Sequence, residues 1–375
     1  MELSWIEISK SALIHNLKTF RKLVGEDVVL SQAVKGNAYG HDIVEISKIL
    51  EENGINYLCV NALFEAKKLR EAGIKTPILI LGYTPLSDLE EVVDLKDVEI
   101  IAYNIETIKQ LGKIGKKVKI HLKIETGSNR QGVLYADIPK FAAEIKKYPK
   151  IILNGASTHF ANIEDRVSHQ YAMHQLKELK RAIYLLEMEG LAPHYRHSAN
   201  SAATLILPES YFNFVRVGIG MYGMWPSKKT EIASNKTNTD IKLKPVMEWK
   251  TVVAQIKKVK KGSLVGYGCT YKASKDCKIA ILPIGYYDGF VRLLGNRGSV
   301  LIRGKKCPVI GRVCMNIIMV DVTHITDIKL EDEVVLIGKQ RDSIITAEEV
   351  GELSNTINYE VTTRINERIP RILRG

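Results

Sequence analysis

The sequence predicts an α/β protein, a TIM (β/α)8 barrel followed by a C-terminal, mainly β domain. From Val28 onward, short β-rich runs alternate with amphipathic stretches over roughly 220 residues, which is typical of such a barrel. The later chain is rich in β-branched residues and is divided by Gly and Lys-Lys turns. At 375 residues and 45% hydrophobic, the chain can bury two cores. We expect the barrel over residues 1–235 and the β domain over 236–375, with a first strand at residues 1–8 that can pair with the second domain.

The β-rich runs of the first domain can be counted. Between them lie helical patterns with apolar residues three to four apart, such as Ile43-Ile46-Leu50 and Leu176-Leu179-Ile183-Leu186. An open doubly wound sheet is the competing α/β architecture, but it usually has fewer strands and a Gly-x-Gly-x-x-Gly turn after the first, which is absent here. The eight predicted strands are Val28–Lys35, Tyr57–Val60, Pro77–Leu81, Val98–Tyr103, Val118–Glu125, Ile152–His159, His194–Ser198 and Phe214–Gly218.

After Ser227 the pattern changes. Lys228–Asp240 is polar and is expected to be a loop, and Ala347–Glu352 is expected to be the one short helix of the second domain. The predicted strands there are Thr251–Val259, Lys278–Ile284, Val300–Arg303, Ile317–Val322 and Glu333–Ile337.

Composition argues against several classes of protein. No apolar run approaches the roughly 20 residues of a membrane span, and the first residues do not resemble an export signal, so a cytoplasmic protein is expected. Five scattered cysteines without a CxxC pair predict neither disulfides nor a metal site. The net charge of +12 is spread over dispersed lysines without a recognition motif, so we expect no nucleic-acid partner.

Lys35 is the most informative residue. It ends an apolar run and is followed by Gly36 and Gly40, which let the backbone bend closely around a ligand. A desolvated ammonium loses its proton more easily, and the free amine can attack an aldehyde. By itself, the pattern equally fits a lysine that reaches solvent at a strand end, with glycines that merely turn the chain.

Further polar residues stand where the predicted barrel strands end, which is the face that carries the active site in TIM barrels. Singly, each has an ordinary structural interpretation: an arginine such as Arg216 usually pairs with a carboxylate, and His159 could be a strand-end histidine. Together, the cations, amides and hydroxyls suit a phosphorylated aldehyde cofactor. The candidates are Lys35, Tyr39, Lys123, Arg130, His159, Asn200, Ser201, Arg216, Gly218 and Ile219.

At these residues the chain resembles the bacterial alanine racemases. The segment Ala33-Val34-Lys35-Gly36-Asn37-Ala38-Tyr39-Gly40-His41 matches the lysine motif of that family almost letter for letter, and the resemblance covers essentially the whole chain. Other matching segments include 121–127, 158–161, 197–203, 215–219 and 221–223 in the first domain, and 266–268, 283–286, 311–315 and 356–360 in the second.

The resemblance implies pyridoxal 5'-phosphate on Lys35 and a small amino acid as substrate. It also implies a head-to-tail homodimer in which each second domain completes the active site of the other subunit. By similarity, Lys35 acts on the Cα hydrogen of the D-enantiomer, and Tyr267 of the other subunit acts on that of the L-enantiomer. Inversion needs a proton acceptor on each face of a planar carbanion, which agrees with two bases. A phenol is a poor base at neutral pH, so positive groups such as His159 and Arg216 would have to stabilise its anion.

The family also suggests roles for the other residues. Arg216 would face the pyridine nitrogen, and Lys123 is the position that is often carbamylated and would then hold Arg130 towards the substrate carboxylate. The Met315 amide would be a second carboxylate contact. The cofactor would be held by Tyr39, Arg130, His159, Asn200, Ser201, Arg216, Gly218, Ile219 and Tyr359, and the substrate entrance would be lined by Glu164, Arg292, Arg312 and Ile357.

Two positions depart from the family pattern. Asn316 stands where aspartate is common, and Ser128-Asn129 replaces the usual methionine-glycine pair before Arg130. A serine or broad-specificity racemase is therefore the alternative to an alanine racemase that supplies D-alanine for peptidoglycan. A basic-amino-acid decarboxylase and a non-enzymatic cofactor-binding protein are more distant alternatives. Gly266-Tyr267-Gly268 argues against the first, and the presence of a second domain argues against the second.

Overall fold

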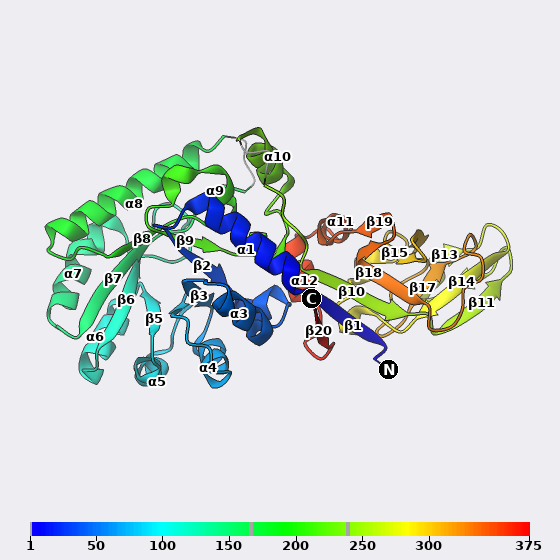
Figure 1. Ribbon diagram of the computed structural model, residues 1–375, viewed down its shortest axis with the longest axis horizontal. Helices are drawn as coiled ribbons and strands as arrows, with labels where there is room; N and C mark the ends of the chain where they lie inside the picture. Colours follow the sequence, from blue (N-terminus) through cyan, green and yellow to red (C-terminus); the bar gives the residue numbers. More distant parts are fainter. Residues whose placement is uncertain (1, 165–167, 238–240) are drawn as a thin grey trace. The chain divides into compact units, whose positions relative to one another are not determined.

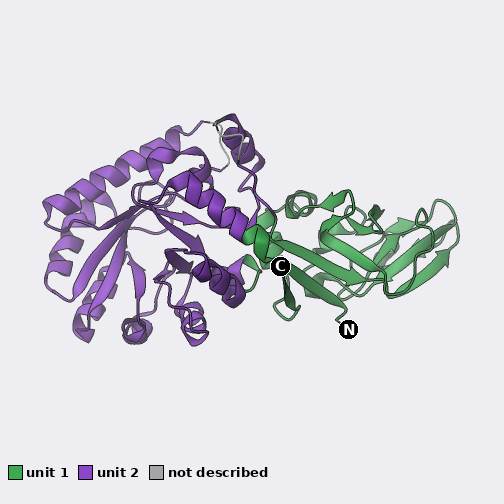
Figure 2. Ribbon diagram, in the orientation of Figure 1, with its two compact units in different colours: residues 1–13, 39–42, 245–375 green, residues 14–38, 43–244 purple. Residues whose placement is uncertain are grey.

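The computed structural model describes residues 2–164, 168–237 and 241–375 of the chain. They form two compact units, coloured separately in Figure 2. We call residues 14–38 and 43–244 the barrel unit, and residues 1–13, 39–42 and 245–375 the β unit. The short segment 39–42, directly after Lys35 and its turn, thus belongs to the β unit.

The barrel unit contains one sheet of eight parallel strands in the order β8-β7-β6-β5-β4-β3-β2-β9. All eight strands predicted from the sequence are present, and the TIM-like fold is confirmed. The strands are β2 (Val29–Ala33), β3 (Tyr57–Val60), β4 (Ile78–Ile80), β5 (Val98–Ala102), β6 (Val118–Lys123), β7 (Ile151–Ser157), β8 (Tyr195–His197) and β9 (Phe214–Val217).

The strands β8 and β9 are not paired in a ladder, but the Asn213 side chain and a backbone hydrogen bond from Arg216 to the carbonyl of Ala199, at 2.9 Å, join them. Asn213 accepts the N–H of Arg196 at 2.8 Å and donates to the carbonyl of His194 at 2.7 Å. With these few bonds in place of a ladder, the eight strands form a nearly closed ring.

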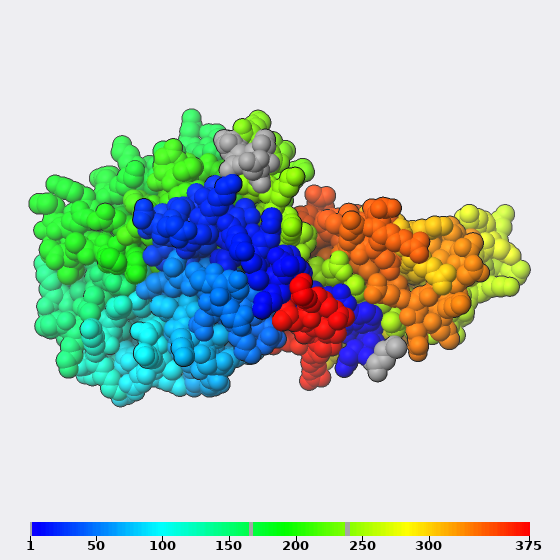
Figure 3. Space-filling model, in the orientation of Figure 1, coloured from blue at the N-terminus to red at the C-terminus, as the bar shows by residue number. Residues whose placement is uncertain are grey.

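Helices surround these strands, as Figure 1 shows, and the space-filling view in the same orientation shows the segments coloured in chain order (Figure 3). The predicted apolar faces are buried, including Ile43, Ile46 and Leu50 on one helix and Leu176 and Leu186 on another. The helices are α1 (Lys10–Val24), α2 (Lys35–Tyr39), α3 (Ile43–Glu52), α4 (Leu63–Glu71), α5 (Leu89–Asp94), α6 (Ile105–Ile114), α7 (Ile138–Lys146), α8 (Gln170–Met188), α9 (Ser201–Ile206) and α10 (Lys228–Thr237).

Helix α10 corrects the prediction of a loop over Lys228–Asp240. The helix covers Lys228–Thr237, and residues 238–240 lie outside the described part of the chain. Ser227 accepts the N–H of Thr230 at its Oγ, and Lys228 pairs with Glu231. A local cap and an ion pair therefore support a helix whose polar composition gives little apolar periodicity.

The β unit contains sheets of seven, three and two strands. The large sheet has the order β16-β15-β18-β10-β1-β20, with β19 attached to β18; the others are β11-β14-β17 and β12-β13. The strands are β1 (Ser4–Ser9), β10 (Met247–Val252), β11 (Gln255–Val259), β12 (Leu264–Val265), β13 (Tyr271–Lys272), β14 (Cys277–Leu282), β15 (Ser299–Ile302), β16 (Lys305–Pro308), β17 (Ile318–Asp321), β18 (Glu333–Gln340), β19 (Ser343–Ile345) and β20 (Arg371–Arg374).

Two predictions for this unit were wrong in detail. The run Thr251–Val259 is divided between β10 and β11, because Val253 donates to Asp332 while Ala254 donates to Ile281, so the chain changes sheets there. A second helix, α12 (Asn358–Thr363), follows the predicted one, α11 (Ala347–Leu353). Strand β1 pairs antiparallel with β10 and parallel with β20, so the first and last strands of the chain share one sheet.

Two kinds of feature are absent from the described residues. No helix among residues 2–164, 168–237 and 241–375 combines the length and the apolar character needed to cross a membrane. Within the same ranges, no group of three or more His, Cys, Asp or Glu side chains is arranged to hold a metal ion.

Candidate active site

Lys35 lies at the carboxyl end of β2 and opens an unusual turn. The next three residues are left-handed, with φ of 61° at Gly36 and 53° at both Asn37 and Ala38. Side chains from neighbouring elements hold this turn, because Glu65 accepts the N–H of Gly36 at 2.7 Å. The Asn37 side chain in turn accepts the N–H of Ile43, at 2.9 Å. Left-handed non-glycine residues are costly, so the surrounding structure must impose this conformation.

The ammonium of Lys35 is destabilised by its surroundings. Burial lowers its pKa from the usual 10.5, and the positive charge of Arg130 lowers it further, while the carboxylate of Glu65 acts in the opposite direction. A lower pKa increases the fraction of free amine at neutral pH. Lys35 therefore has the protonation behaviour expected of a nucleophile or a general base.

Arg130 stands on a loop that is held by a carboxylate. Glu125 accepts the N–H groups of Gly127 at 2.6 Å and Arg130 at 3.3 Å. Burial alone would raise the pKa of the Glu125 carboxyl, but these backbone donors lower it overall. Asn129 has a φ of 51°, a conformation that asparagine tolerates better than most residues. The Ser128-Asn129 pair can thus follow a path that would otherwise favour glycine.

Three further groups near Lys35 also have lowered pKa values. Burial lowers the pKa of Lys123 to about 7, and the charges of Arg216, Arg130 and Lys35 contribute. Burial and neighbouring cations, Arg216 foremost, lower the pKa of His159 well below 6.5. Burial also lowers the pKa of Arg216, to about 10. The barrel thus concentrates positive charge, which suits an anionic ligand and keeps His159 neutral.

Hydroxyl and amide groups gather after β8 and β9. Ser201 Oγ accepts the N–H of Gly218 at 2.8 Å and that of Gly220 at 3.2 Å. Asn200 caps α9 by accepting the N–H of Ala203, and its amide donates to Glu164 at 2.9 Å. Ile219 begins a short 3-10 helix, Ile219–Tyr222, directly beside this group. Phosphate binds well at such places in TIM barrels.

The remaining candidates belong to the β unit. The rings of Tyr39 and Tyr359 are 5.9 Å apart, and Gly40 fits closely here, since a Cβ on it would overlap the carbonyl oxygen of Thr362. Tyr267 begins a 3-10 turn, Tyr267–Cys269, between two left-handed glycines and is 73% exposed. Met315 is 55% exposed.

The predicted residues therefore form two groups. In the barrel unit, Arg130 and Arg216 lie close enough for their charges to lower the pKa of Lys35, Lys123 and His159. The β unit carries Tyr39, Tyr267, Met315 and Tyr359. Sequence reasoning did not single out Glu65 or Gly220, whose contacts support the lysine turn and the serine. A glutamate in the first turn of a helix was the available signal for Glu65, but only the fold shows that it reaches Gly36.

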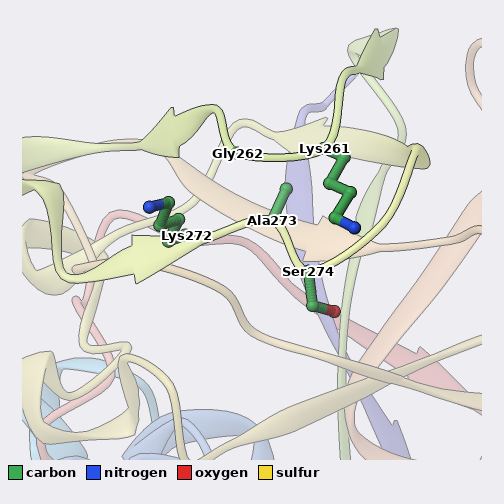
Figure 4. A pocket seen from close by; sticks show the side chains of 5 residues that line it. All are labelled: Lys261, Gly262, Lys272, Ala273 and Ser274. Atoms are coloured by element: carbon green, nitrogen blue, oxygen red, sulfur yellow. The ribbon is translucent and has the colours of Figure 1, made fainter.

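A separate pocket of about 600 Å³ lies at the β12–β13 hairpin. Its lining residues are Lys261, Gly262, Lys272, Ala273 and Ser274, and in Figure 4 the two lysine side chains extend on either side of Ala273. None of the predicted site residues lines this pocket, so it is not the candidate site.

Comparisons with known proteins agree with the sequence over both units. Residues 8–226 match the family described as alanine racemase, N-terminal domain, and residues 246–373 match alanine racemase, C-terminal domain. The chain belongs to the alanine racemase family. Members of this family are amino-acid racemases, which are isomerases, and the chain is an enzyme of this class.

Individual members of the alanine racemase family are similar over nearly their whole length. An alanine racemase of Leptospira interrogans (serovar Lai) is 39% identical over 372 residues, covering 99% of this chain and 95% of the relative. Alanine racemase 2 of Caldanaerobacter subterraneus subsp. tengcongensis is 40% identical, covering 98% and 94%.

Solved structures of alanine racemases share the fold. That of Clostridium difficile 630 has a TM-score of 0.92 at 35% identity, covering 100% of this chain and 96% of the other. The enzyme of Bacillus anthracis with bound L-Ala-P has a TM-score of 0.93 at 36% identity, with the same coverage.

Proposed function

We propose that this family member interconverts L- and D-alanine with pyridoxal 5'-phosphate bound at Lys35. The observation that carries the proposal is the partly buried Lys35 amine, whose pKa is lowered by burial and by Arg130, at the end of a barrel strand. An amine in this state suits an aldehyde cofactor, and the relatives named alanine racemase support the choice of reaction.

The donor set of the barrel unit fits the cofactor. Ser201 and the amides of Gly218 and Ile219 would hold its phosphate, with Tyr39 and Tyr359 as further contacts. The hydrogen bonds from Gly218 and Gly220 to Ser201 Oγ keep these groups together. Arg216 would face the ring nitrogen as a permanent cation. When bound, the cofactor supplies an electron sink that acidifies the Cα hydrogen of an amino acid.

The residues of the chain would then move the proton. Lys35 would exchange it on one face of the substrate and Tyr267 of a second subunit on the other, since a planar carbanion needs a base on each face for inversion. The 73% exposure of Tyr267 in the single chain supports a role at a site completed by another subunit. We propose a homodimer with shared sites and a role in supplying D-alanine for peptidoglycan.

Arg130 and the Met315 amide would hold the substrate carboxylate. A carbamate on Lys123, whose amine has a pKa of about 7, would steady Arg130 by replacing a nearby positive charge with a negative one.

Alanine is the proposed substrate. Serine remains the second candidate because Asn316, which donates to Asp288 at 3.5 Å, stands where a negative charge is more usual. Turnover of alanine, serine and lysine separates these possibilities, and serine turnover below one hundredth of alanine turnover would exclude a broad specificity.

The test is solvent deuterium incorporation at Cα of L- and D-alanine, measured with purified holoenzyme. Wild type should exchange and invert both enantiomers, whereas Tyr267→Phe should lose exchange from the L-enantiomer selectively. Tyr184→Phe, at a 64% exposed tyrosine on α8, is the matched control and should behave as wild type. Release of carbon dioxide would indicate a decarboxylase instead. Cofactor binding without exchange on any amino acid would indicate a binding protein.

A further inference from the structure

A line of polar side chains crosses the interior of the barrel behind Arg216. His197 Nδ1 is hydrogen-bonded to Arg216 Nη1, and its Nε2 lies 2.7 Å from His121 Nδ1. His121 Nε2 lies 2.7 Å from Glu99 Oε2. The four residues stand on β9, β8, β6 and β5, and each is less than 10% exposed. Barrel interiors are normally filled by branched apolar residues, so this polar line needs an explanation.

The proton positions along the line follow from its two ends. A guanidinium can only donate, so His197 Nδ1 must accept. A neutral imidazole then carries its proton on Nε2, which donates to His121 Nδ1. His121 is therefore protonated on Nε2 and donates to Glu99, and an imidazolium at either position would place two donors face to face. Every hydrogen bond points from Arg216 towards Glu99.

The ionisation of the groups agrees with this assignment. Burial by itself would raise the pKa of Glu99, but the hydrogen bonds from His121 and Asn154 and the charge of Lys119 lower it, so this group is a carboxylate at neutral pH. Burial lowers the pKa of both histidines, so they remain neutral. The carboxylate also accepts bonds from Asn154 at 2.7 Å and Tyr57 at 3.1 Å, and Lys119 Nζ lies 3.4 Å away.

The backbone is shaped to admit His121. The register between β6 and β7 shifts at Ile120/His121, and Gly155 of β7 lies directly against the ring. A Cβ on Gly155 would overlap His121 Nδ1, the atom that accepts from His197. A missing side chain and a register irregularity at the same point make room for this histidine.

We propose that Glu99 is a positioning residue for Arg216, acting through His121 and His197 in fixed tautomers. The carboxylate fixes the direction of the hydrogen bonds along this line. His197 Nδ1 therefore always presents a lone pair to the guanidinium. No proton moves along the line. Its effect is to hold one guanidinium nitrogen, while Arg216 Nη2 donates to the carbonyl of Thr158 at 2.8 Å. The arginine is thus oriented within a barrel that offers it no direct carboxylate partner among the described contacts.

The positioning role of Glu99 rests on the proposed function only through the role of Arg216 at the cofactor. The histidine tautomers can therefore be tested without measuring activity. Neutron diffraction of deuterium-exchanged crystals locates the protons directly. We expect deuterium on Nε2 of both His121 and His197 and none on either Nδ1. Deuterium on Nδ1 of either ring, alone or together with Nε2, would overturn the proposal. A wild-type enzyme without racemase activity would overturn the proposed function but not this result.

The second test uses two variants that break the line differently. Glu99→Gln removes the charge while its carbonyl can still accept from His121, and Gly155→Ala pushes His121 away while Glu99 stays. Both should lower kcat about tenfold with KM for alanine within about twofold, and both should shift the absorption maximum of the bound cofactor in the absence of substrate. Glu144→Gln, at a buried glutamate on the outer helix α7, is the control and should change neither.

Folding defects are separated by measuring thermal stability and cofactor content in each variant. If either line variant keeps full kcat and an unshifted spectrum while folded and fully loaded, the proposal is wrong. If Gly155→Ala misfolds, Glu99→Gln and the neutron result still decide it.

Discussion

Five basic side chains in one barrel decide the residue-scale chemistry of this protein. Burial lowers the pKa of Lys35, Lys123 and His159, and the charges of Arg130 and Arg216 lower all three further. Repulsion between desolvated charges lowers the stability of the folded protein. Such a loss is commonly tolerated where a functional site requires those charges. In the proposed reaction, the benefit is a larger fraction of free amine at Lys35 and a positive field that would attract an anionic cofactor and a carboxylate substrate.

Lys123 allows this cost to be measured. Its pKa is about 7 in the folded protein and 10.5 in the unfolded chain, so between these values the unfolded state binds more protons and stability rises with pH. We predict that Lys123→Met in cofactor-free protein raises the free energy of unfolding by a few kcal/mol near pH 7, and that the gain shrinks towards pH 10. Urea unfolding in buffer free of carbon dioxide measures it.

The control for this prediction is Lys113→Met, at an exposed lysine on α6. Its difference from wild type should stay constant over the same pH range. A Lys123→Met gain that is also constant with pH would show that the methionine stabilises by packing rather than by removing a desolvated charge.

At the scale of elements, the left-handed turn after Lys35 is the feature that the site depends on. It is followed by Gly40, which has a φ of 87° and no room for a side chain against Thr362 of α12. Position 40 therefore requires glycine for two reasons, its positive φ and the lack of space for a side chain. Both constrain the segment 39–42, which includes Tyr39.

We predict that Gly40→Ala lowers the free energy of unfolding by about 2 kcal/mol or more beyond the effect of Gly25→Ala. Gly25 has a similar φ of 79°, but a Cβ added to it would meet nothing within 4 Å, so it measures the backbone strain alone, about 1 kcal/mol. Denaturant unfolding of both variants tests the difference. Equal losses would mean that Thr362 moves aside easily.

At the scale of the whole molecule, the proposed bases lie on different units, Lys35 on the barrel unit and Tyr267 on the β unit. The proposal that two subunits share each site has a sharp consequence. In a heterodimer of Lys35→Ala and Tyr267→Phe, one site would carry both lesions and the other would carry none.

We therefore predict that mixing the two inactive variants, with dissociation and reassociation of subunits, restores racemisation of alanine to roughly a quarter of the wild-type rate per site, the statistical share of intact sites. The control is Lys35→Ala mixed with Arg130→Ala, in which every site keeps one lesion and no activity should return. If the first mixture also stays inactive although heterodimers form, the sites lie within single subunits.

Much of this molecule was predictable because its signals are local. The eight barrel strands are short apolar runs between amphipathic helices, and Lys35 is recognisable from the strand it ends and the glycines that follow. The helix at Lys228–Thr237 was missed because its support comes from a cap and an ion pair rather than from apolar periodicity. The division of Thr251–Val259 was missed because both halves have the same β-branched character, and only their different partners separate them.

The sequence by itself determined the α/β class, the eight barrel strands and the residues that end them, since periodicity and turn residues are properties of neighbouring positions. Only the tertiary structure determined the burial, the neighbouring charges and the hydrogen-bond partners of those residues. Glu65 reaches Gly36, Glu125 holds the Arg130 loop, and Glu99, His121 and Gly155 meet from three neighbouring strands. Burial and charge act through space, so pKa values, tautomers and close contacts become defined only when the barrel closes.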